Sequence, residues 1–461
     1  MLPNNFYAQM YNPAYMRTDK AIEISFAGLS GFSFMNQGNF KISDLVTTPN
    51  GSPVIDPVHF YENISQNSHI RQDISVPLAF FSFPLKKGVF NAYYKENISS
   101  ALKFKKDLID FLVNGNTERE YRNFSTDALN LISTGYREFA VGYTIKMNKK
   151  LDAGAYAKLL FGAAFLEADN WNFHIETSAN GSLINLMADG DGYMMIPLPV
   201  TLRTDSTILR IDTKDVFSKY IKSYQNPGFA IDLGLNYRIN SKNSFSASVR
   251  DLGMILYNTD AMTLYEYERY DYIGFDLVSA VRFNEEPGYE HPLYLIDLLK
   301  DSIRNVWHPK AVKSGFTSAL ATKTILHYQH KYSEKLSFGV TNQSTFQKNN
   351  FQNILTLTAM QSWPYFSVFE NLNLHGASNV CVGGGFQYEG DFFQAFLATD
   401  NIIAFYHPAN NKTFSVTAGI CILLNHKTEK DIYDNNKGIK NRKGKISPDL
   451  PYYKKLRELH Q

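Results

Sequence analysis

The sequence has only two cysteines, Cys381 and Cys421, among 461 residues, and it has no excess of either charge sign. Two cysteines form neither a disulfide scaffold nor a cysteine-based metal site. Lys and Arg total 46 while Asp and Glu total 44, which excludes a protein that binds nucleic acid through its overall charge. No segment approaches the run of about 20 apolar residues that a transmembrane helix needs, which excludes a helical inner-membrane protein.

Aromatic residues, in contrast, are abundant. Phe and Tyr number 34 and 29, and aromatic residues make up 14% of the chain. These side chains favour β-strands and membrane interfaces. Hydrophobic residues make up 44%, which is ample for a folded protein and not typical of a disordered one. The composition therefore indicates a folded β-protein, and it is compatible with a membrane protein built of strands.

Strict alternation of apolar and polar residues marks the predicted strands. It is clearest in 137–147, 228–240 and 413–424, where every second residue is large and apolar. Side chains of a strand alternate between its two faces, so each of these segments has one apolar face. The apolar face is predicted to contact lipid at Phe139, Val141, Tyr143, Phe229, Ile231, Leu233, Leu235, Tyr237, Phe414, Val416 and Ile420. The polar face is predicted to line a hydrated lumen at Glu138, Lys146, Asp232, Asn236, Arg238 and Arg250.

Two architectures produce such alternation. A soluble β-sandwich turns its apolar faces inward, whereas an outer-membrane β-barrel turns them outward into lipid. Soluble strands are usually about five or six residues long, and a tilted strand needs about 9–11 residues to cross a bilayer. The longer segments of this sequence favour an all-β protein, a transmembrane antiparallel β-barrel of about 14 strands within a range of about 12 to 18.

The connections between the predicted strands fall into two classes. Short polar turns lie at 148–150, 241–243, 333–335 and 389–391, and long links lie at roughly 30–70, 95–134, 179–227, 283–310 and 399–412. Outer-membrane barrels have short periplasmic turns and long external loops. By this rule the strand 413–424 ends on the periplasmic side. The first residues lack the basic and apolar regions of a signal peptide, so an exported protein is expected to have lost that peptide before this sequence begins.

Three segments have apolar residues at helical spacing, namely 98–113, 214–221 and 293–306. We predict short helical inserts there, in loops or in a plug of the barrel. An amphipathic helix usually packs on its own chain, so this interpretation is preferred. The alternative is a docking surface for a partner protein.

The chain is predicted to divide into a barrel, 1–425, and a basic periplasmic tail, 426–461. The tail has eight Lys and two Arg against five acidic residues and carries +5, which leaves residues 1–425 at −3. A basic run is most often only solvated. A purely solubilising tail gains nothing from Tyr, however, so the cluster Leu450, Pro451, Tyr452 and Tyr453 is a candidate partner-binding peptide.

No constellation of catalytic or metal-binding residues is recognisable. Gly383, Gly384 and Gly385 lack the Lys and Ser or Thr of a phosphate-binding loop. His327 and His330 are three residues apart on a predicted strand, so they point to opposite faces and cannot share a metal ion. The sequence therefore predicts a protein that is not an enzyme, with no catalytic residues, no metal and no cofactor.

Several phrases of the sequence together resemble a known family. They lie at 11–15, which reads Tyr-Asn-Pro-Ala-Tyr, and at 111–116, 137–143, 158–162, 229–234 and 246–253. Over 11–424 they look like the DUF5723 family of outer-membrane barrels of Bacteroidota, which is distantly similar to the PorV and PorP/SprF barrels of the type IX secretion system. The resemblance implies a location in the bacterial outer membrane, with lipid around the barrel. It supplies no catalytic or binding residues.

Two functions follow as alternatives. The first is a non-enzymatic subunit or accessory of a multiprotein outer-membrane complex for protein export or outer-membrane protein assembly, with partners in the outer membrane or periplasm. Its basis is the tail, the helical inserts and the similarity to secretion barrels. The second is a channel for hydrophobic or small solutes, resembling fatty-acid transporters. A conducting lumen favours the channel, whereas stable partners and a plugged lumen favour the subunit.

Overall fold

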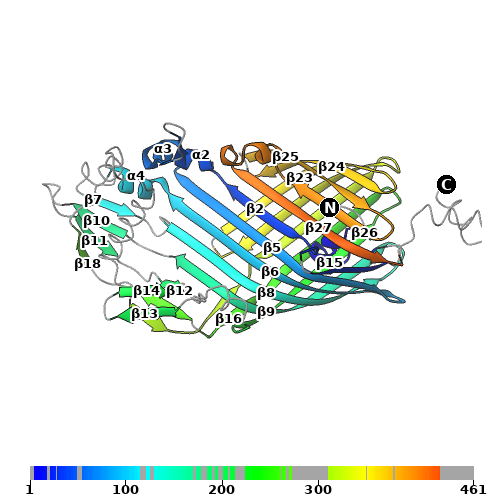
Figure 1. The fold of residues 1–461 in the computed structure, drawn as a ribbon, viewed down its shortest axis with the longest axis horizontal. Coiled ribbons are helices and arrows are strands. Elements are labelled where there is room, and N and C mark those ends of the chain that lie inside the picture. The colour runs from blue at the N-terminus through cyan, green and yellow to red at the C-terminus, as the bar shows by residue number, and fades with distance from the viewer. Residues whose placement is uncertain are drawn as a thin grey trace, which may run out of the picture.

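The structure is a computed structural model, and its described residues form mainly one closed antiparallel sheet (Figure 1). It describes residues 5–17, 21–26, 28–48, 54–114, 121–124, 129–169, 173–177, 184–188, 193–195, 201–205, 208–212, 224–259, 261–265, 269–272, 310–348, 350–376 and 379–425. The sheet closes into a barrel of 14 strands, as the sequence predicts. In a closed barrel every strand has two hydrogen-bonded neighbours, which is the only arrangement of a sheet that lipid tolerates.

Twelve of the barrel strands are continuous in the chain. Their bounds are β5 (Asn67–Pro84), β6 (Gly88–Lys105), β8 (Leu129–Lys146), β9 (Leu151–Asp169), β15 (Pro227–Arg238), β16 (Asn243–Tyr257), β22 (Leu336–Gln347), β23 (Asn350–Ser362), β24 (Phe366–His375), β25 (Asn379–Glu389), β26 (Phe393–Thr399) and β27 (Thr413–Leu424). Each of them pairs antiparallel with its neighbours. The long alternating segments of the sequence correspond to parts or all of β8, β15 and β27.

The other two strands are interrupted. One consists of β1 (Ile22–Phe26) and β2 (Phe32–Gly38), which lie between β5 and β27 and close the barrel. Gly31, with φ of +117°, lies where they meet, and a Cβ there would stand 2.6 Å from the carbonyl oxygen of Ala418. The other consists of β20 (Phe316–Ala319) and β21 (Thr322–Lys331), which both pair with β16.

The two ends of the barrel differ. The short turns predicted at 148–150, 241–243, 333–335 and 389–391 lie at one end, which we call the turn end. At the opposite, loop end lie the short helices, the small sheets and three short strands that extend the main sheet (Figure 1). These elements are α2 (Ile42–Leu45), β3 (Val46–Thr47), β4 (Val54–Ile55), α3 (Pro57–Asn63), α4 (Lys106–Asn114), β7 (Tyr121–Phe124), β10 (Phe173–Thr177), β11 (Ile184–Ala188), β12 (Tyr193–Met195), β13 (Thr201–Asp205), β14 (Ile208–Asp212), β17 (Met262–Tyr265), β18 (Arg269–Tyr272), β19 (Lys310–Lys313), α8 (Ile403–Tyr406) and η3 (Pro408–Asn410).

The helix predicted over 98–113 is wrong in its first half. Residues 98–105 continue strand β6, and only 106–114 form the helix α4. Ile98, for example, pairs with Ile74 of β5 on one side and with Gly135 of β8 on the other. Two ladders of backbone hydrogen bonds therefore outweigh the local helical pattern. The predicted helices at 214–221 and 293–306 and the tail 426–461 lie outside the described residues.

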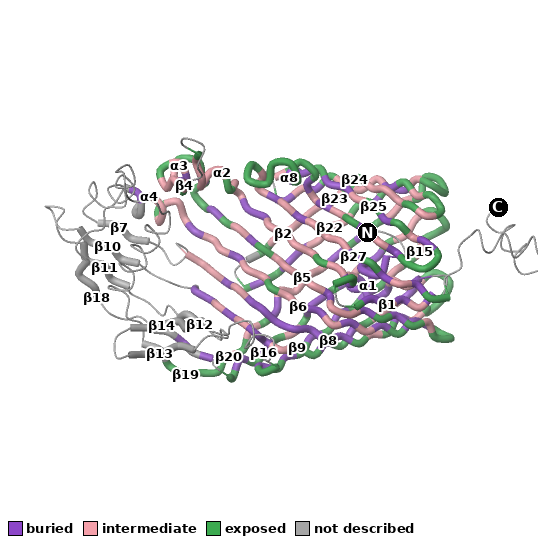
Figure 2. The backbone as a smooth tube through the Cα atoms, viewed as in Figure 1, coloured by how far each residue is buried: buried purple, intermediate pink, exposed green. Residues whose placement is uncertain are grey.

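The outer face of the barrel is apolar. Buried, half-buried and exposed positions alternate along the barrel strands (Figure 2). Nine of the predicted lipid-facing residues have exposed fractions of 38–58%, and Phe414 and Val416, on the same face of β27, are half-buried. A water-soluble monomer rarely exposes such a continuous apolar belt. In the described part of the chain, no helix is long and apolar enough to span a membrane. The protein is a transmembrane β-barrel of the outer-membrane type.

Candidate functional site

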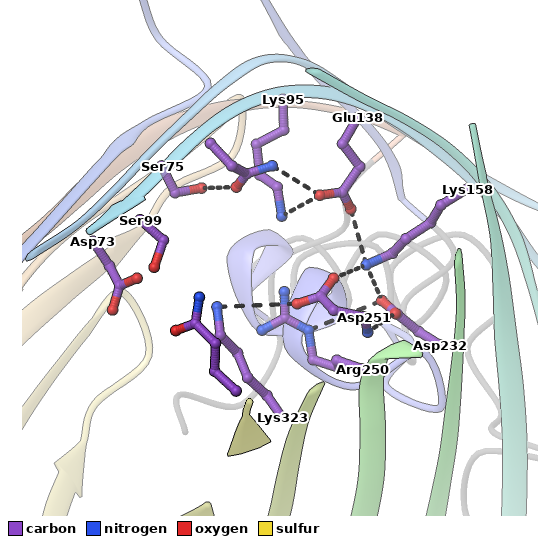
Figure 3. A network of polar contacts seen from close by, with 12 residues as sticks. Asp73, Ser75, Lys95, Ser99, Glu138, Lys158, Asp232, Arg250, Asp251 and Lys323 are labelled. Carbon is purple, nitrogen blue, oxygen red and sulfur yellow. Dashed lines mark hydrogen bonds and ion pairs between the residues drawn. The ribbon is translucent and has the colours of Figure 1, made fainter. Parts of the chain in front are cut away.

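The N-terminal segment 5–17 lies inside the barrel, and we call it the plug. It contains the helix α1 (Phe6–Tyr11), whose pale blue coil is visible beside the sticks in Figure 3. The side chain of Asn5 accepts a hydrogen bond from the backbone N–H of Tyr7 at 2.8 Å and so caps the helix. Phe6 and Ala14 are fully buried. A segment of the chain thus fills part of the lumen.

One side of the plug packs on the apolar part of the wall. The Phe6 ring lies 5.5 Å from that of Phe80 and 5.8 Å from that of Phe396, measured between centroids.

Burial raises the pKa of Tyr7, and it raises the pKa of Tyr15 to about 12 although a hydrogen bond with Ser246 acts in the opposite direction. Both phenols therefore remain neutral hydrogen-bonding groups at physiological pH.

Polar groups of β1, β25 and β26 fix the ends of the plug. Gln387 and Gln394 accept hydrogen bonds from the Asn5 side chain, at 2.9 Å, and from the Phe6 backbone, at 3.2 Å. At the other end, Arg17 pairs with Glu389 at 2.5 Å and with Glu23 at 3.7 Å. These contacts are hydrogen bonds and ion pairs, which water and ions can replace.

The Asn-Pro-Ala sequence at 12–14 lies against two glycines of the wall, Gly154 and Gly234, which pair across β9 and β15. We call this pair the glycine saddle. A Cβ on Gly154 would stand 2.0 Å from the Pro13 carbonyl oxygen, and one on Gly234 would stand 2.1 Å from Asn12 Oδ1. Only glycine allows such a close approach of the two backbones. The Asn-Pro-Ala phrase and these two glycines, far apart in the sequence, therefore form one contact.

Beside the plug, a network of buried charges crosses the lumen face of the wall (Figure 3). Its centre is the Lys158 ammonium group on β9, which lies 2.9 Å from Glu138 of β8, 2.7 Å from Asp232 of β15 and 2.6 Å from Asp251 of β16. The side chain of Lys158 is fully buried. One cation thus contacts three carboxylates and joins four neighbouring strands.

Further cations surround these carboxylates. Lys95 lies 3.1 Å from Glu138, Arg250 lies 3.9 Å from Asp232, and Lys323 lies 4.0 Å from Asp251. The Arg250 guanidinium also stands over the ring of Tyr11 in the plug, 4.6 Å from its centroid. Such a cation–π contact connects the network to the plug.

The six predicted lumen-lining residues occupy two places in the structure. Glu138, Asp232 and Arg250 belong to the buried network, whereas Asn236 and Arg238 contact Asp152 nearer the turn end, where Lys146 also lines the lumen. The sequence reasoning missed Lys95, Lys158 and Asp251. Alternation along the strand could have identified Lys158. Tyr156 and Lys158 are two residues apart and both are buried on the lumen face, whereas the next residue, Leu159, is exposed on the outer face.

Asp251 could not be placed by alternation. Strict alternation would put it on the lipid face, next to the lumen-facing Arg250. A bulge in the β15–β16 ladder, together with a φ of +60° at Asp251, turns both side chains into the lumen. Asp is among the few residues that tolerate this backbone region. The Asp251 backbone N–H donates to Asp232 at 2.7 Å, which fixes the bulge.

The plug separates two cavities. The turn-side chamber has a volume of about 920 Å³ and is lined by Asn5, Gln9 and Arg17 of the plug and by the hairpin turns. The loop-side chamber has a volume of about 270 Å³ and is lined by Tyr7, Met10 and Tyr11 of the plug and by the buried network. The plug therefore forms a thin layer with space on both sides. Within the described residues, no cluster of three or more His, Cys, Asp or Glu could hold a metal ion.

Three of the solved structures to which the chain is similar are described as two toluene transporters and a FadL homologue. The chain is similar to the Pseudomonas putida toluene transporter TodX, with 9% identity, a TM-score of 0.40 and coverage of 92% of this chain and 93% of that one. It is similar to a Pseudomonas aeruginosa FadL homologue, with 10% identity, a TM-score of 0.41 and coverage of 92% and 95%. It is also similar to the Ralstonia pickettii toluene transporter TbuX, with 8% identity, a TM-score of 0.40 and coverage of 91% of this chain and 92% of that one. None of the three is named as an enzyme.

No curated protein matches the sequence. A family model does, over residues 13–400, from Pro13 of the plug to the residue that follows β26. The model is described as a family of unknown function, DUF5723. The match covers most of the chain, and the protein therefore belongs to the DUF5723 family.

Proposed function

We propose that the protein is a channel for small solutes whose lumen is closed by the movable plug. The supporting observation is the pair of chambers on the two sides of segment 5–17. A barrel that serves only as a scaffold needs no internal space, and a protein interior normally packs without it. A plugged lumen taken alone favours the scaffold, but two chambers separated by one thin layer favour a closed passage.

The lumen favours small polar solutes over hydrophobic ones. The loop-side chamber is lined by Asp73, Lys95, Arg250, Asp251 and Lys323. An apolar solute that passes these groups would remove water from them without replacing their hydrogen bonds. Small polar solutes therefore fit this passage better than apolar ones.

In the membrane, we propose that the turn end faces the periplasm and the loop end faces outward. The support is the general rule that outer-membrane barrels have short periplasmic turns and long external loops. The turn-side chamber then opens to the periplasm, and the strand β27 ends on that side.

A solute-flux measurement tests the channel. Purified protein is placed in liposomes, and the efflux of glycerol, amino acids and a trisaccharide is compared for the complete chain and for a variant without residues 5–16. We expect the complete chain to pass the smaller solutes faster than protein-free liposomes do, and the deletion variant to be several times faster, because the thin layer is gone. If the deletion variant conducts but the complete chain equals protein-free liposomes for every solute, the plug is a permanent seal and the channel proposal is wrong.

The hypothesis of a multiprotein complex, based on the tail, stays a prediction. Residues Leu450–Tyr453 lie outside the described residues, so its support is their composition alone. Deletion of 426–461 is expected to remove partner proteins from the barrel purified from native membranes. An unchanged set of co-purifying proteins would contradict the hypothesis, and the mobility of unheated protein in detergent gels would show that the shortened barrel is folded.

A further inference from the structure

The wall of the turn-side chamber carries an excess of positive charge. Its lining residues include eight cations and a single carboxylate, that of Asp152. The cations are Arg17, Lys86, Lys87, Lys146, Lys149, Arg238, Lys242 and Lys331. Residues 1–425 as a whole carry −3, so this concentration of positive charge is opposite in sign to the charge of the barrel.

Most of these cations have no counter-charge among the described residues. Arg17 pairs with Glu389 and Glu23, and Arg238 pairs with Asp152. For the six lysines, the described part of the chain contains no ion pair. They come from four successive hairpins, β5–β6, β8–β9, β15–β16 and β21–β22, and so form an arc along one side of the chamber.

The loop-side chamber has no such excess. Three carboxylates, from Asp73, Asp251 and Asp400, oppose three cations, from Lys95, Arg250 and Lys323. The positive excess therefore belongs to one side of the plug and is not a general property of the lumen. A cavity lined by charges of one sign concentrates their field and raises the local concentration of counter-ions.

The basic tail cannot supply the missing negative charge. It follows β27 in the chain but carries +5 itself. Small mobile anions can supply negative charge to such a chamber. Lysine ammonium groups suit carboxylate and phosphate oxygens, because they donate up to three hydrogen bonds without a fixed geometry.

We propose that the turn-side chamber binds small solutes with carboxylate or phosphate groups and makes the passage selective for anions. The inference names the substrate class of the channel proposed above and rests on that proposal. Anion binding itself does not require conduction, so the two can fail separately. Lipid headgroups also carry phosphate groups, and the experiment distinguishes binding of a lipid headgroup from binding of a free solute.

Two matched double variants test the role of the chamber. The first, Lys149→Glu with Lys331→Glu, changes lysines that line the chamber, and the second, Lys150→Glu with Lys335→Glu, changes lysines of the same two hairpins that do not line it. Each double variant lowers the net charge by the same amount. The two double variants have the same net charge and change the same two hairpins. A difference in anion binding or selectivity between them therefore depends on whether the lysines line the chamber.

Binding is measured by calorimetry with inorganic phosphate and with citrate, in a neutral detergent at low salt. Selectivity is measured as the reversal potential across a planar bilayer in a salt gradient. We expect the lining variant to bind about tenfold more weakly or worse, equivalent to about 1.4 kcal/mol, and its reversal potential to move toward cation selectivity. The other variant should equal the unmodified protein. Binding should also weaken with added salt, because salt screens exposed charges.

Each other outcome has a distinct meaning. Equal binding and equal selectivity of the two variants would overturn the proposal. Binding of phosphate and citrate that is lost only in the lining variant, without any conduction, would keep the anion site and reject the channel. The remaining outcome is that neither anion binds in neutral detergent, while vesicles with anionic phospholipid bind and the lining variant binds them more weakly. The ligand is then a lipid headgroup, and the solute proposal is wrong.

Discussion

Replacement of Lys158 by methionine is expected to destabilise the barrel by about 3–5 kcal/mol, the usual effect of removing one partner from a buried ion pair. The Lys158 ammonium group is the only cation within 3 Å of Asp232 and Asp251 among the described contacts. Methionine has a similar length and fills the same space, so the effect comes from charge rather than from a cavity. Glu138 would keep Lys95, but the other two carboxylates would remain buried with cations no nearer than 3.9 Å.

The measurement is urea unfolding in lipid vesicles, followed by the mobility of unheated samples in detergent gels. The control is Lys323→Met, because Lys323 is 25% exposed and lies 4.0 Å from Asp251. This variant is expected to lose at most about 1 kcal/mol, as is typical of exposed pairs. Lys158→Met combined with Asp251→Asn should recover part of the loss, because one unpaired carboxylate is removed as well. Equal effects of the two single variants would show that the buried network does not stabilise the barrel.

Replacement of Gly234 by valine is expected to expel the plug and leave the barrel folded. A Cβ at this position would stand 2.1 Å from Asn12 Oδ1 and 2.9 Å from the Ala14 backbone nitrogen, so the plug and the new side chain cannot occupy the same place. Valine is itself favourable in a strand, which leaves the pairing of β15 with β9 and β16 intact. The ionic conductance of the variant should rise several times above that of the unmodified protein.

Two measurements separate this result from general unfolding. Protease should cleave the N-terminal segment of the Gly234→Val variant faster than that of the unmodified protein, while the gel mobility of the barrel stays that of the folded form. The matched control is Gly135→Ala on β8, where a Cβ would meet nothing nearer than the Ala164 Cβ at 3.4 Å. It should leave both protease cleavage and conductance unchanged. Unchanged conductance of the Gly234 variant would mean that the saddle does not hold the plug in place.

Much of the wall could be predicted from the sequence. The segment 413–424 corresponds to β27 residue for residue, and 228–240 corresponds to β15 within two residues at its C-terminal end. The alternation also assigned Phe229 and Asp232 to opposite faces of the sheet. The prediction failed over 98–105, where the local spacing of apolar residues is helical but two neighbouring strands supply the hydrogen bonds.

The site was less accessible to sequence reasoning. Glu138, Asp232 and Arg250 were assigned to the lumen one by one, but their convergence on Lys158 depends on the order of strands around the barrel. Asp251 reaches the network only through a bulge, which reverses the alternation at that point. The role of 12–14 as the contact of a plug requires Gly154 and Gly234, which are about 140 and 220 residues further along the chain.

The few cysteines, the balanced charge and the absence of long apolar runs, together with alternation of period two, determined that this chain forms a β-barrel with an apolar outer face. These are local properties, since consecutive side chains of a strand always point to opposite faces. Only the tertiary structure decided what the barrel contains. Closure of the sheet brings four strands around Lys158, places the N-terminal segment in the lumen and gathers the turn lysines at one end. Such contacts depend on register and strand order across hundreds of residues, which alternation along a single strand does not encode.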